Sequence, residues 1–369
     1  MNTIKIARPT LILDVEKCKA NIQRMAEKAT AQQVLFRPHF KTHQSADIGD
    51  WIREYGVDRC TVSSVKMAEY FARHGWQDIL IAFPANVLEA GEINELGKDC
   101  KLQLLVYSVE TLNILKKKIN VKVGVKIELD LGSRRSGLAI NQHEEIDELL
   151  RRINESPNFS FTGFYSHPGH TYASKSKDEV VKKYDVILKQ LYMLKASYGH
   201  TLGFSITIGD TPGCTLMDDF GPIDEISPGN FVFYDAMQVN IGTCTYDDIA
   251  VVMACPVVGK NPDRNELLIH GGAVHFSKEV LQDPDGIVHY GKLARKTESG
   301  WKEHIDGAYL KSISQEHGLI HAPDELLQNT QIGDIIYIYP VHSCLAADLM
   351  KSYLTTDQVM MDGESAFMS

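Results

Sequence analysis

The sequence predicts an α/β protein, a (β/α)8 TIM barrel that is followed by an antiparallel β domain. Short apolar, β-branched runs recur before Gly242, and amphipathic segments separate most of them. Strands that are apolar on both faces and alternate with helices form parallel sheets covered by helices. After Gly242 the helical periodicity fades, and short strand-like runs are separated by Gly, Pro, Asn and Asp. That pattern is typical of an antiparallel β domain.

The elements can be placed in chain order. The first, Pro9–Leu13, is a strand that precedes the first helix, and we expect it to pair with the C-terminal sheet. Barrel strands are expected at 34–37, 60–63, 78–82, 102–107, 121–129, 161–166, 205–209 and 231–233. Helices are expected at 45–55, 65–74, 87–96, 109–118, 144–153 and 178–198. Strands of the β domain are expected at 250–258, 265–269, 306–312 and 334–339.

Eight strand–helix units fit a closed barrel better than an open doubly wound sheet. The sequence therefore predicts a barrel over residues 15–243. The β domain would comprise residues 1–14 and 244–369.

Bulk composition excludes several classes of protein. A chain of 369 residues suits about two domains, and 44% hydrophobic with 23% charged residues is ordinary for a globular protein. The net charge of −10 argues against a nucleic-acid or anionic-membrane surface. No apolar run has the length of a signal peptide core or of a membrane span, and the seven cysteines show no C-x-x-C spacing. These features predict a cytoplasmic protein with reduced thiols.

Lys41 follows the first barrel strand, in Arg-Pro-His-Phe-Lys-Thr-His (37–43). The functional face of such a barrel lies at the C-terminal ends of its strands. An amine at the mouth of a buried strand is partly desolvated and easier to deprotonate, as a Schiff-base lysine requires. The alternative is an ordinary surface charge, one of 38 Lys and Arg residues.

The loop Gly-Asp-Thr-Pro-Gly (209–213) follows the seventh strand. The backbone at Gly209 and the hydroxyl of Thr211 could bind a phosphate there, as loops of such barrels often do. An ordinary strand-to-helix turn is the alternative. After the fifth strand stand Arg134 and Arg135, one of which could hydrogen-bond a ring nitrogen or a carboxylate while the other is a surface charge.

Two histidines follow the sixth strand, His167 and His170, with Tyr165 and Tyr172 around them. Histidine titrates near neutral pH, so either could be an acid–base group; packed or solvated side chains are the alternative.

His342-Ser343-Cys344 follows an apolar strand near the end of the β domain. In an extended segment residues i and i+2 point to the same face, so the imidazole and the thiol could share one metal ion. A nitrogen and a thiolate suit Zn²⁺, and two ligands leave open positions, as a catalytic site would. The alternative is a buried cysteine beside an unrelated histidine.

Taken together, these motifs resemble the D-threonine aldolase and D-serine dehydratase family, which are fold-type III enzymes using pyridoxal 5′-phosphate and are related to the barrel of alanine racemase. The resemblance covers nearly the whole chain. It is carried by the Lys41 segment, by Asp-x-Gly-x-x-Arg-x-Gly (130–137), and by Tyr-Ser-His-x-Gly-His-x-Tyr (165–172). The segments 228–235 and 314–318, together with His342-x-Cys344, complete it.

The resemblance implies roles for the matching positions. Lys41 would carry the cofactor, and Arg135, Tyr165 or Tyr172 would line its ring or phosphate. The phosphate would be bound at Gly209 and Thr211 with help from Tyr234. His342 and Cys344 would bind a divalent metal, zinc in preference to manganese. A homodimer acting on a small D-amino acid is implied as well.

Two reactions fit this set of residues. If Lys41 removes the α-proton, water is eliminated, and D-serine gives pyruvate and ammonia. If His167 or His170 takes the hydroxyl proton, the Cα–Cβ bond breaks, and D-threonine or D-3-hydroxyaspartate gives glycine and an aldehyde. The His-x-Cys pair favours the dehydratase. An amino-acid racemase and a non-enzymatic pyridoxal-phosphate carrier are alternatives; the metal pair disfavours the first and the long C-terminal domain the second.

Overall fold

The computed structural model describes residues 5–199 and 203–363. By packing, the chain divides into two compact units. The barrel unit comprises Arg24–Lys41 and Ile48–Gly229; the sheet unit comprises the chain up to Gln23, Thr42–Asp47 and the chain from Asn230 onward. The chain thus passes from one unit to the other between Lys41 and Thr42. The boundaries expected from sequence, 15–243 for the barrel, stay a prediction.

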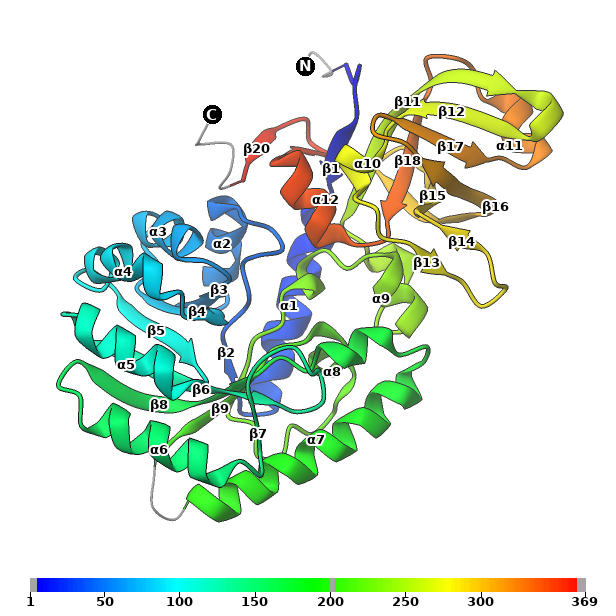
Figure 1. Ribbon diagram of the computed structural model, residues 1–369. Coiled ribbons are helices and arrows are strands. Elements are labelled where there is room, and N and C mark those ends of the chain that lie inside the picture. The colour runs from blue at the N-terminus through cyan, green and yellow to red at the C-terminus, as the bar shows by residue number, and fades with distance from the viewer. Residues whose placement is uncertain (1–4, 200–202, 364–369) are drawn as a thin grey trace. The chain divides into compact units, whose positions relative to one another are not determined.

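The barrel unit contains a ring of eight parallel strands (Figure 1). In spatial order they are β3 (Arg59–Val62), β4 (Asp78–Pro84), β5 (Lys101–Val106), β6 (Val123–Asp130), β8 (Phe159–Ser166), β9 (Ser205–Ile208), β10 (Glu225–Ile226) and β2 (Leu35–Phe36). Seven residues of β6 are buried in succession, as expected for a strand covered on both faces. A two-residue strand, β7 (Leu138–Ala139), pairs with β6 outside the ring.

The ring closes through a parallel bridge between His39 and Thr61. The amide of Phe40 donates to Thr61 O at 2.8 Å, and the amide of Thr61 donates to Pro38 O at 2.9 Å. The closed barrel predicted from sequence is therefore confirmed. The predicted eighth strand at 231–233 was wrong, because Asn230–Val232 is a 3-10 turn (η3) and the eighth strand is β10.

Helices connect the strands on the outside of the ring. They are α2 (Ala46–Arg53), α3 (Val65–Arg73), η1 (Val87–Glu89) with α4 (Ala90–Leu96), α5 (Val109–Lys118), α6 (His143–Asn154), η2 (Gly169–Ala173), α7 (Lys177–Tyr198) and α8 (Thr211–Leu216). Serine begins three of them: Ser64, Ser108 and Ser176 each accept a hydrogen bond from the third helical amide. The first helix, α1 (Val15–Ala31), precedes β2. The positions of α2, α3, η1 with α4, α5, α6 and α7 agree closely with the six helices expected from the sequence.

A buried ion network joins the strands inside the barrel unit. Arg37 pairs with Asp78 at 2.7 Å and with Glu225 at 2.9 Å, and Lys126 lies 3.8 Å from Glu225. Arg37 contacts Glu225 Oε2, and Thr207 donates to Glu225 Oε1 at 2.7 Å. Because each charge has a partner, the network can stay ionised away from water.

The sheet unit is built on a mostly antiparallel nine-stranded sheet. In spatial order its strands are β12 (Glu266–His270), β17 (His317–His321), β16 (Trp301–Ile313), β15 (Gly291–Lys296), β18 (Ile335–Pro340), β11 (Val251–Asn261), β1 (Thr10–Leu13), β19 (Ser352–Thr355) and β20 (Met360–Asp362). As predicted, β1 joins this sheet, antiparallel to β11 and parallel to β19.

The remaining elements of the sheet unit are short. They are η3, α9 (Ala236–Ile241), η4 (Tyr246–Asp248), η5 (Pro262–Arg264), α10 (Ala273–Phe276), the hairpin β13 (Leu281–Gln282) with β14 (Val288–His289), α11 (Asp324–Asn329) and α12 (Ser343–Met350).

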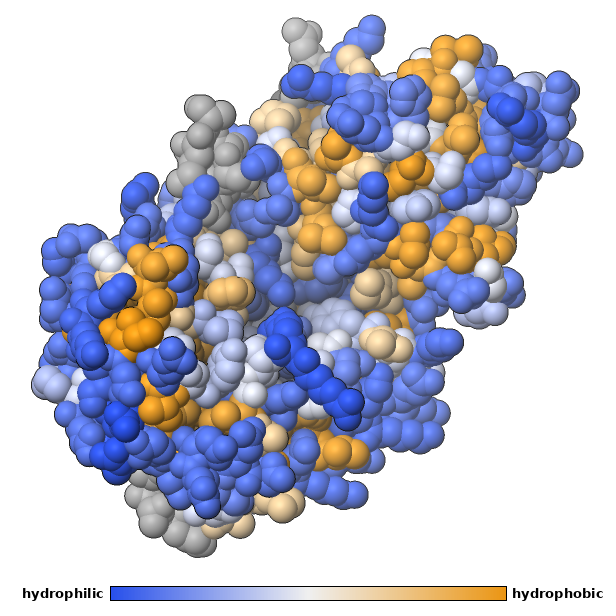
Figure 2. Space-filling view, in the orientation of Figure 1, coloured by the Kyte–Doolittle hydropathy of each residue, from blue (hydrophilic) through white to orange (hydrophobic). Residues whose placement is uncertain are grey.

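Hydrophilic side chains predominate on the face of the molecule drawn in Figure 2. Figure 2 shows that hydrophobic side chains on the visible face lie in separate groups among hydrophilic residues. Within the described ranges, no helix has both the length and the apolar content needed to cross a bilayer.

Candidate active site

Lys41 stands on the short segment that follows β2. The bridge at His39 fixes the start of this segment against β3, and the amide of Lys41 donates to His39 Nδ1 at 3.3 Å. The side chain of His39 is buried and Lys41 is half-buried. The backbone of the lysine is thus held by the point at which the barrel closes.

His167 follows β8 and faces two cations of the barrel unit. Its Nδ1 donates to the carbonyl oxygen of Gly209. Burial, with the nearby charges of Lys41 and Arg135, lowers the pKa of His167 to about 3. The ring is therefore neutral near pH 7, with its hydrogen on Nδ1, and Nε2 keeps a lone pair that can accept a hydrogen bond.

The loop after β9 is shaped by a buried carboxylate. Asp210 caps α8 by accepting from the amide of Gly213 at 2.8 Å, and it also accepts from the hydroxyls of Thr171 (2.8 Å) and Tyr184. Burial raises the pKa of Asp210 to about 6 despite these bonds. The amide of Thr211 donates to Tyr172 Oη at 3.1 Å. The predicted phosphate loop is therefore also an ordinary helix start with a well-bonded cap.

Gly209 lies close to β8, and its amide donates to Ser166 O at 3.0 Å. A Cβ there would lie 2.8 Å from Tyr165 Oη and 3.0 Å from Ser227 O, so a larger residue would push the loop from the tyrosine. The rings of His167 and Tyr172 lie 6.0 Å apart. Hydrogen bonds and a ring contact therefore connect His167, Tyr172, Gly209 and Thr211, and electrostatic interactions extend the group to Lys41 and Arg135.

Glu128 is a residue of this group that the sequence did not single out. Ser136 donates to its Oε1 at 2.8 Å, whereas its Oε2 is buried without a hydrogen-bond partner among the described residues. Burial raises the pKa of Glu128, and the charge of Arg135 opposes that effect. The side chain of Tyr165 is also buried, and burial together with the charge of Glu128 raises the pKa of its hydroxyl. The residue pattern of a strand does not distinguish a functional carboxylate from an ordinary one, so the sequence alone could not identify Glu128.

His170 lies at the edge of the group. Its ring packs against Gly132, and its Nδ1 is buried without a partner in the described part of the chain. Burial, together with Lys183, lowers the pKa of His170, and Asp130 opposes the shift. Of the two histidines, His167 is the one that contacts the predicted phosphate loop directly, through its hydrogen bond to Gly209 O.

His342 and Cys344 come together in the sheet unit, but not in the predicted geometry. The segment is not extended throughout: His342 is the N-cap residue of α12, and Cys344 lies in its first turn. The prediction that residues i and i+2 of a strand share a face was therefore wrong here. The two side chains are still in contact, because the side chain of an N-cap residue can fold back over the first turn of its helix. A side-chain hydrogen bond with Cys344 is one of the causes that raise the pKa of His342.

Three further side chains surround this pair. Glu279 Oε2 lies 2.7 Å from His342 Nδ1, so Nδ1 carries a hydrogen and Nε2 is left as the ligand atom. Thr42 Oγ1 lies 3.1 Å from Cys344 Sγ, and Asn230 Nδ2 donates to the same sulfur at 3.6 Å. Sequence spacing could not reveal these partners, which come from three distant segments.

The surroundings of His342 favour a positive charge, which is a proton on the ring when no metal is bound and would be the cation itself when one is bound. Burial alone would lower its pKa, but Cys344, Glu279 and Asp235 outweigh burial and raise it. Asp235 is buried and accepts from the amide of Ser343 at 3.0 Å and from Asn230 at 2.6 Å. An imidazole and a thiol that face each other among carboxylates form a donor set suited to a divalent cation.

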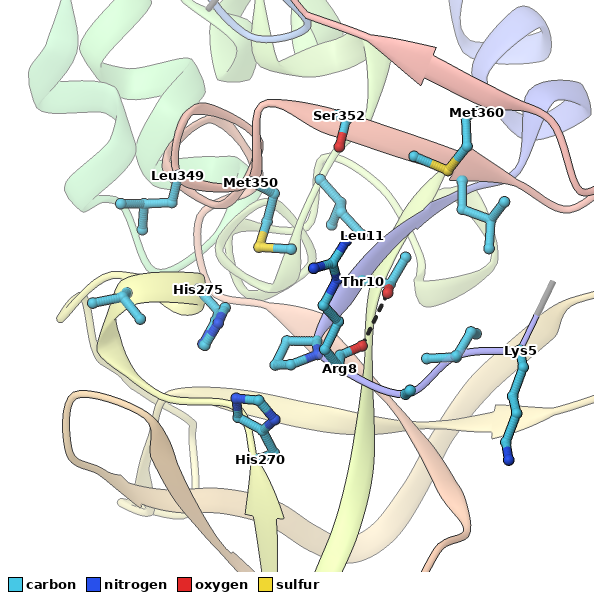
Figure 3. Close-up of a pocket in the computed structure, with 15 residues that line it drawn as sticks. Lys5, Arg8, Thr10, Leu11, His270, His275, Leu349, Met350, Ser352 and Met360 are labelled. Atoms are coloured by element: carbon cyan, nitrogen blue, oxygen red, sulfur yellow. Dashed lines mark hydrogen bonds between the residues drawn. The ribbon is translucent and has the colours of Figure 1, made fainter. Parts of the chain in front are cut away.

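A second set of possible ligands lines a cavity of about 710 Å³ in the sheet unit (Figure 3). His270 and His275 lie on its wall, and Glu316 Oε2 is 3.5 Å and 3.8 Å from their Nε2 atoms. However, the amide of Gly272 donates to His275 Nδ1 at 3.1 Å. The neutral ring therefore carries its hydrogen on Nε2, where it faces the carboxylate instead of offering a lone pair to a metal.

Tyr234, expected near the cofactor phosphate, belongs to the sheet unit. It is buried and has a φ of 51°, a left-handed conformation that is uncommon for residues other than glycine. Its role toward the cofactor stays a prediction.

Fold and site together define a class of protein: a barrel with a lysine after its first strand, joined to a β domain with a His-x-Cys pair. The family model "Alanine racemase, N-terminal domain" matches residues 13–236, and the model "Putative serine dehydratase domain" matches residues 250–356. The chain belongs to this alanine racemase-like family of fold-type III pyridoxal-phosphate enzymes.

Relatives match along nearly the whole chain. D-serine dehydratase of Dictyostelium discoideum is 27% identical, covering 93% of this chain and 91% of the relative. D-threo-3-hydroxyaspartate dehydratase of Delftia sp. is 24% identical over 94% and 93%. 3-Hydroxy-D-aspartate aldolase of Paracoccus denitrificans is 29% identical over 93% and 86%.

Solved structures have the same fold. The chain superposes on D-threo-3-hydroxyaspartate dehydratase from Delftia sp. HT23 with a TM-score of 0.88 at 22% identity, covering 98% and 99% of the two chains. D-threonine aldolase from Filomicrobium marinum gives 0.84 at 18% identity, with 99% of both chains covered. Alanine racemase of Clostridium difficile gives 0.67 at 12%, covering 97% and 98%.

The residues of the barrel unit fit the family's cofactor. Pyridoxal phosphate needs an amine for attachment, donors for a phosphate, and polar groups for its ring. Lys41 has the amine, Thr211 has a hydroxyl, and Arg135 with Tyr172 adds a cation and a second hydroxyl; the amides of Gly209 and Thr211 already donate to Ser166 O and Tyr172 Oη. Glu128 Oε2, which has no hydrogen-bond partner among residues 5–199 and 203–363, is one more polar atom in this group.

Proposed function

We propose that this chain is a lyase that uses pyridoxal phosphate and a divalent metal, and that its principal reaction converts D-serine to pyruvate and ammonia. The observation that carries the proposal is the pairing of His342 with Cys344, backed by Glu279, on a chain that also carries Lys41 in the family's position. Three curated relatives are named D-serine dehydratases, and a fourth is named a dehydratase of hydroxyaspartate.

Lys41 would hold the cofactor and, once released, accept the α-proton of the substrate. When bound, pyridoxal phosphate supplies a conjugated ring that stabilises negative charge at that carbon. Arg135, Tyr172 and the loop at Thr211 would orient the cofactor, and buried Tyr165 would limit access of water. Holding reacting groups in one geometry in this way is a large part of enzymatic rate enhancement.

His342 and Cys344 would hold the cation, for which we propose zinc. A nitrogen and a thiolate are ligands typical of Zn²⁺, and two protein ligands leave positions for water and substrate. Solved structures of D-threo-3-hydroxyaspartate dehydratase include a histidine variant and a cysteine variant altered two positions apart, and the cysteine variant is described as metal-free. That spacing equals the spacing of His342 and Cys344.

A second candidate, cleavage of a D-3-hydroxy amino acid to glycine and an aldehyde, is supported by His167. Its ring is neutral, and its Nε2 can accept a hydrogen bond from a β-hydroxyl. Relatives named 3-hydroxy-D-aspartate aldolase and D-threonine aldolase carry out such chemistry. The dehydratase is preferred because the thiolate ligand and the first-named relatives favour it.

The test uses the full-length protein loaded with pyridoxal phosphate and zinc. It is incubated separately with D-serine, D-threonine and D-3-hydroxyaspartate, with L-serine as control, and the 2-oxo acid, glycine and L-isomer are measured. We expect pyruvate from D-serine and none from L-serine. Glycine as the main product would replace the dehydratase by the aldolase, and L-serine formed from D-serine would establish a racemase. Turnover of none of these would overturn the lyase.

The metal has its own test. Chelation should lower the rate at least about tenfold, and Cys344→Ser should lower bound zinc, measured by atomic emission, because the hydroxyl is a far weaker ligand than a thiolate. Unchanged zinc content in Cys344→Ser would remove Cys344 from the site. Sedimentation of the loaded protein would test the homodimer that we also propose.

A further inference from the structure

Thr42 is bonded in the chain to one residue that the proposed function requires and contacts another. It follows Lys41 directly in the chain, and its hydroxyl contacts the sulfur of Cys344. We propose that Thr42 is a positioning residue that couples metal binding at His342 and Cys344 to cofactor binding at Lys41. The inference rests on the proposed function, because it needs both the metal and the cofactor.

The contact is placed where a hydrogen bond has a large effect. Thr42 is fully buried and Cys344 is 9% exposed, so water does not compete for their 3.1 Å contact. Either atom can donate in a thiol–hydroxyl pair. A metal-bound sulfur is a thiolate and can only accept, so metal binding would make Thr42 the donor. Bonds to an ionised acceptor are shorter and about twice as strong as neutral ones.

The segment that begins at Thr42 is fastened to the sheet unit along its length. Tyr353 Oη donates to His43 O at 2.6 Å, and Gln44 Nε2 donates to Asp348 Oδ1 at 2.9 Å. Gln44 adopts a φ of 50°, which fixes an uncommon turn directly after the segment starts. A bond that fixes the torsions of Thr42 therefore fixes the direction in which the chain enters this anchored turn.

Lys41 is one peptide bond away, and consecutive Cα atoms are about 3.8 Å apart. Ordering of Thr42 restricts the backbone of Lys41 from one side, while the bridge at His39 restricts it from the other. A metal that orders Thr42 therefore reduces the conformational entropy that the backbone at Lys41 still loses when the cofactor binds. By linkage, the cofactor must then tighten the metal by the same factor.

The experiment measures this factor in both directions on the full-length protein without substrate. The dissociation constant of pyridoxal phosphate is measured by absorbance with and without zinc. The dissociation constant of zinc is measured by competition with a chromophoric chelator, with and without pyridoxal phosphate. In the natural protein we expect each ligand to tighten the other about tenfold, which is within the usual range for coupled sites.

The variants separate the coupling from simple loss of a ligand. Thr42→Val removes the hydroxyl and should bring both factors close to one, whereas Thr42→Ser keeps the hydroxyl and should retain them. Glu279→Gln is the matched control: it should weaken zinc about tenfold through His342, while the coupling factor stays unchanged because Thr42 and Cys344 are intact. If Thr42→Val fails to fold by circular dichroism, Thr42→Ala is measured in its place.

The two proposals fail in different ways. A natural protein that binds zinc and pyridoxal phosphate independently, or a Thr42→Val variant that keeps the full factor, overturns the coupling and leaves the lyase standing. A protein that binds no zinc overturns the metal of the proposed function, and the coupling with it. Equal factors in both directions that vanish in Thr42→Val and return in Thr42→Ser establish the role of Thr42.

Discussion

Two polar clusters of the barrel unit contain the same kinds of residue and differ in how their charges are satisfied. In the paired cluster (Arg37, Asp78, Lys126 and Glu225), every charged group has a close partner. In the open cluster (Glu128, Arg135, His167 and His170, with Lys41), Glu128 Oε2 and His170 Nδ1 are buried with no hydrogen bond in the described ranges.

The difference separates structural charge from functional charge. A buried polar atom without a partner costs about 1–3 kcal/mol, so a fold retains one only where something else is gained. Arg37 stands in the same short motif as Lys41, and sequence alone ranks them equally as cations. The charge of Arg37 is neutralised by Asp78 and Glu225 within the paired cluster. The open cluster instead contains buried polar atoms that can contact a ligand.

The largest expected effect is that of Lys41→Ala. Loss of the attachment amine should abolish visible absorbance with pyridoxal phosphate and lower the turnover of D-serine at least about a thousandfold. Stability should change by no more than about 0.5 kcal/mol, because the side chain is half-buried. The matched variant Lys126→Met should do the opposite, keeping the absorbance and losing stability. A yellow Lys41→Ala protein would remove Lys41 from the site.

A pair of isosteric substitutions compares the clusters directly. Glu225→Gln leaves Arg37 and Lys126 without their shared counter-charge and should lower the free energy of unfolding by about 3 kcal/mol. Glu128→Gln removes a carboxylate whose burial is unfavourable, so stability should fall by less than about 1 kcal/mol or rise. Both are measured by urea unfolding of the cofactor-free protein. Equal losses in the two variants would contradict the distinction between paired and open clusters.

The smallest effect is a pH dependence of the paired cluster. Burial would raise the pKa of Asp78, but Arg37 and Lys101 lower it to about 2. A carboxyl group with a depressed folded-state pKa contributes stability above its unfolded pKa, near 3.8, and loses it as pH falls toward 2. The free energy of unfolding should therefore fall between about pH 5 and pH 2, and Asp78→Asn should flatten part of that slope. An unchanged slope in Asp78→Asn would place the acid sensitivity elsewhere.

Much of the architecture follows from local patterns. The apolar runs and amphipathic segments determine seven of the eight barrel strands and the six predicted helices, because period and capping are properties of neighbouring residues. The strand β1 and its pairing with the C-terminal sheet were predicted in the same way. The eighth strand was missed because β10 (Glu225–Ile226) lies in no apolar run, whereas the equally short β2 lies in Val34-Leu35-Phe36.

The candidate site divides along the same line. The sequence by itself determined which chemical groups are present, Lys41, His167 and the pair His342 and Cys344, because their motifs are contiguous. Only the tertiary structure decided their partners. Glu279 hydrogen-bonds His342 Nδ1, the hydroxyl of Thr42 contacts Cys344 Sγ, and Glu128 interacts electrostatically with Arg135. Those contacts join residues far apart in the chain, and hydrogen bonding depends on distance in space, which no local period records.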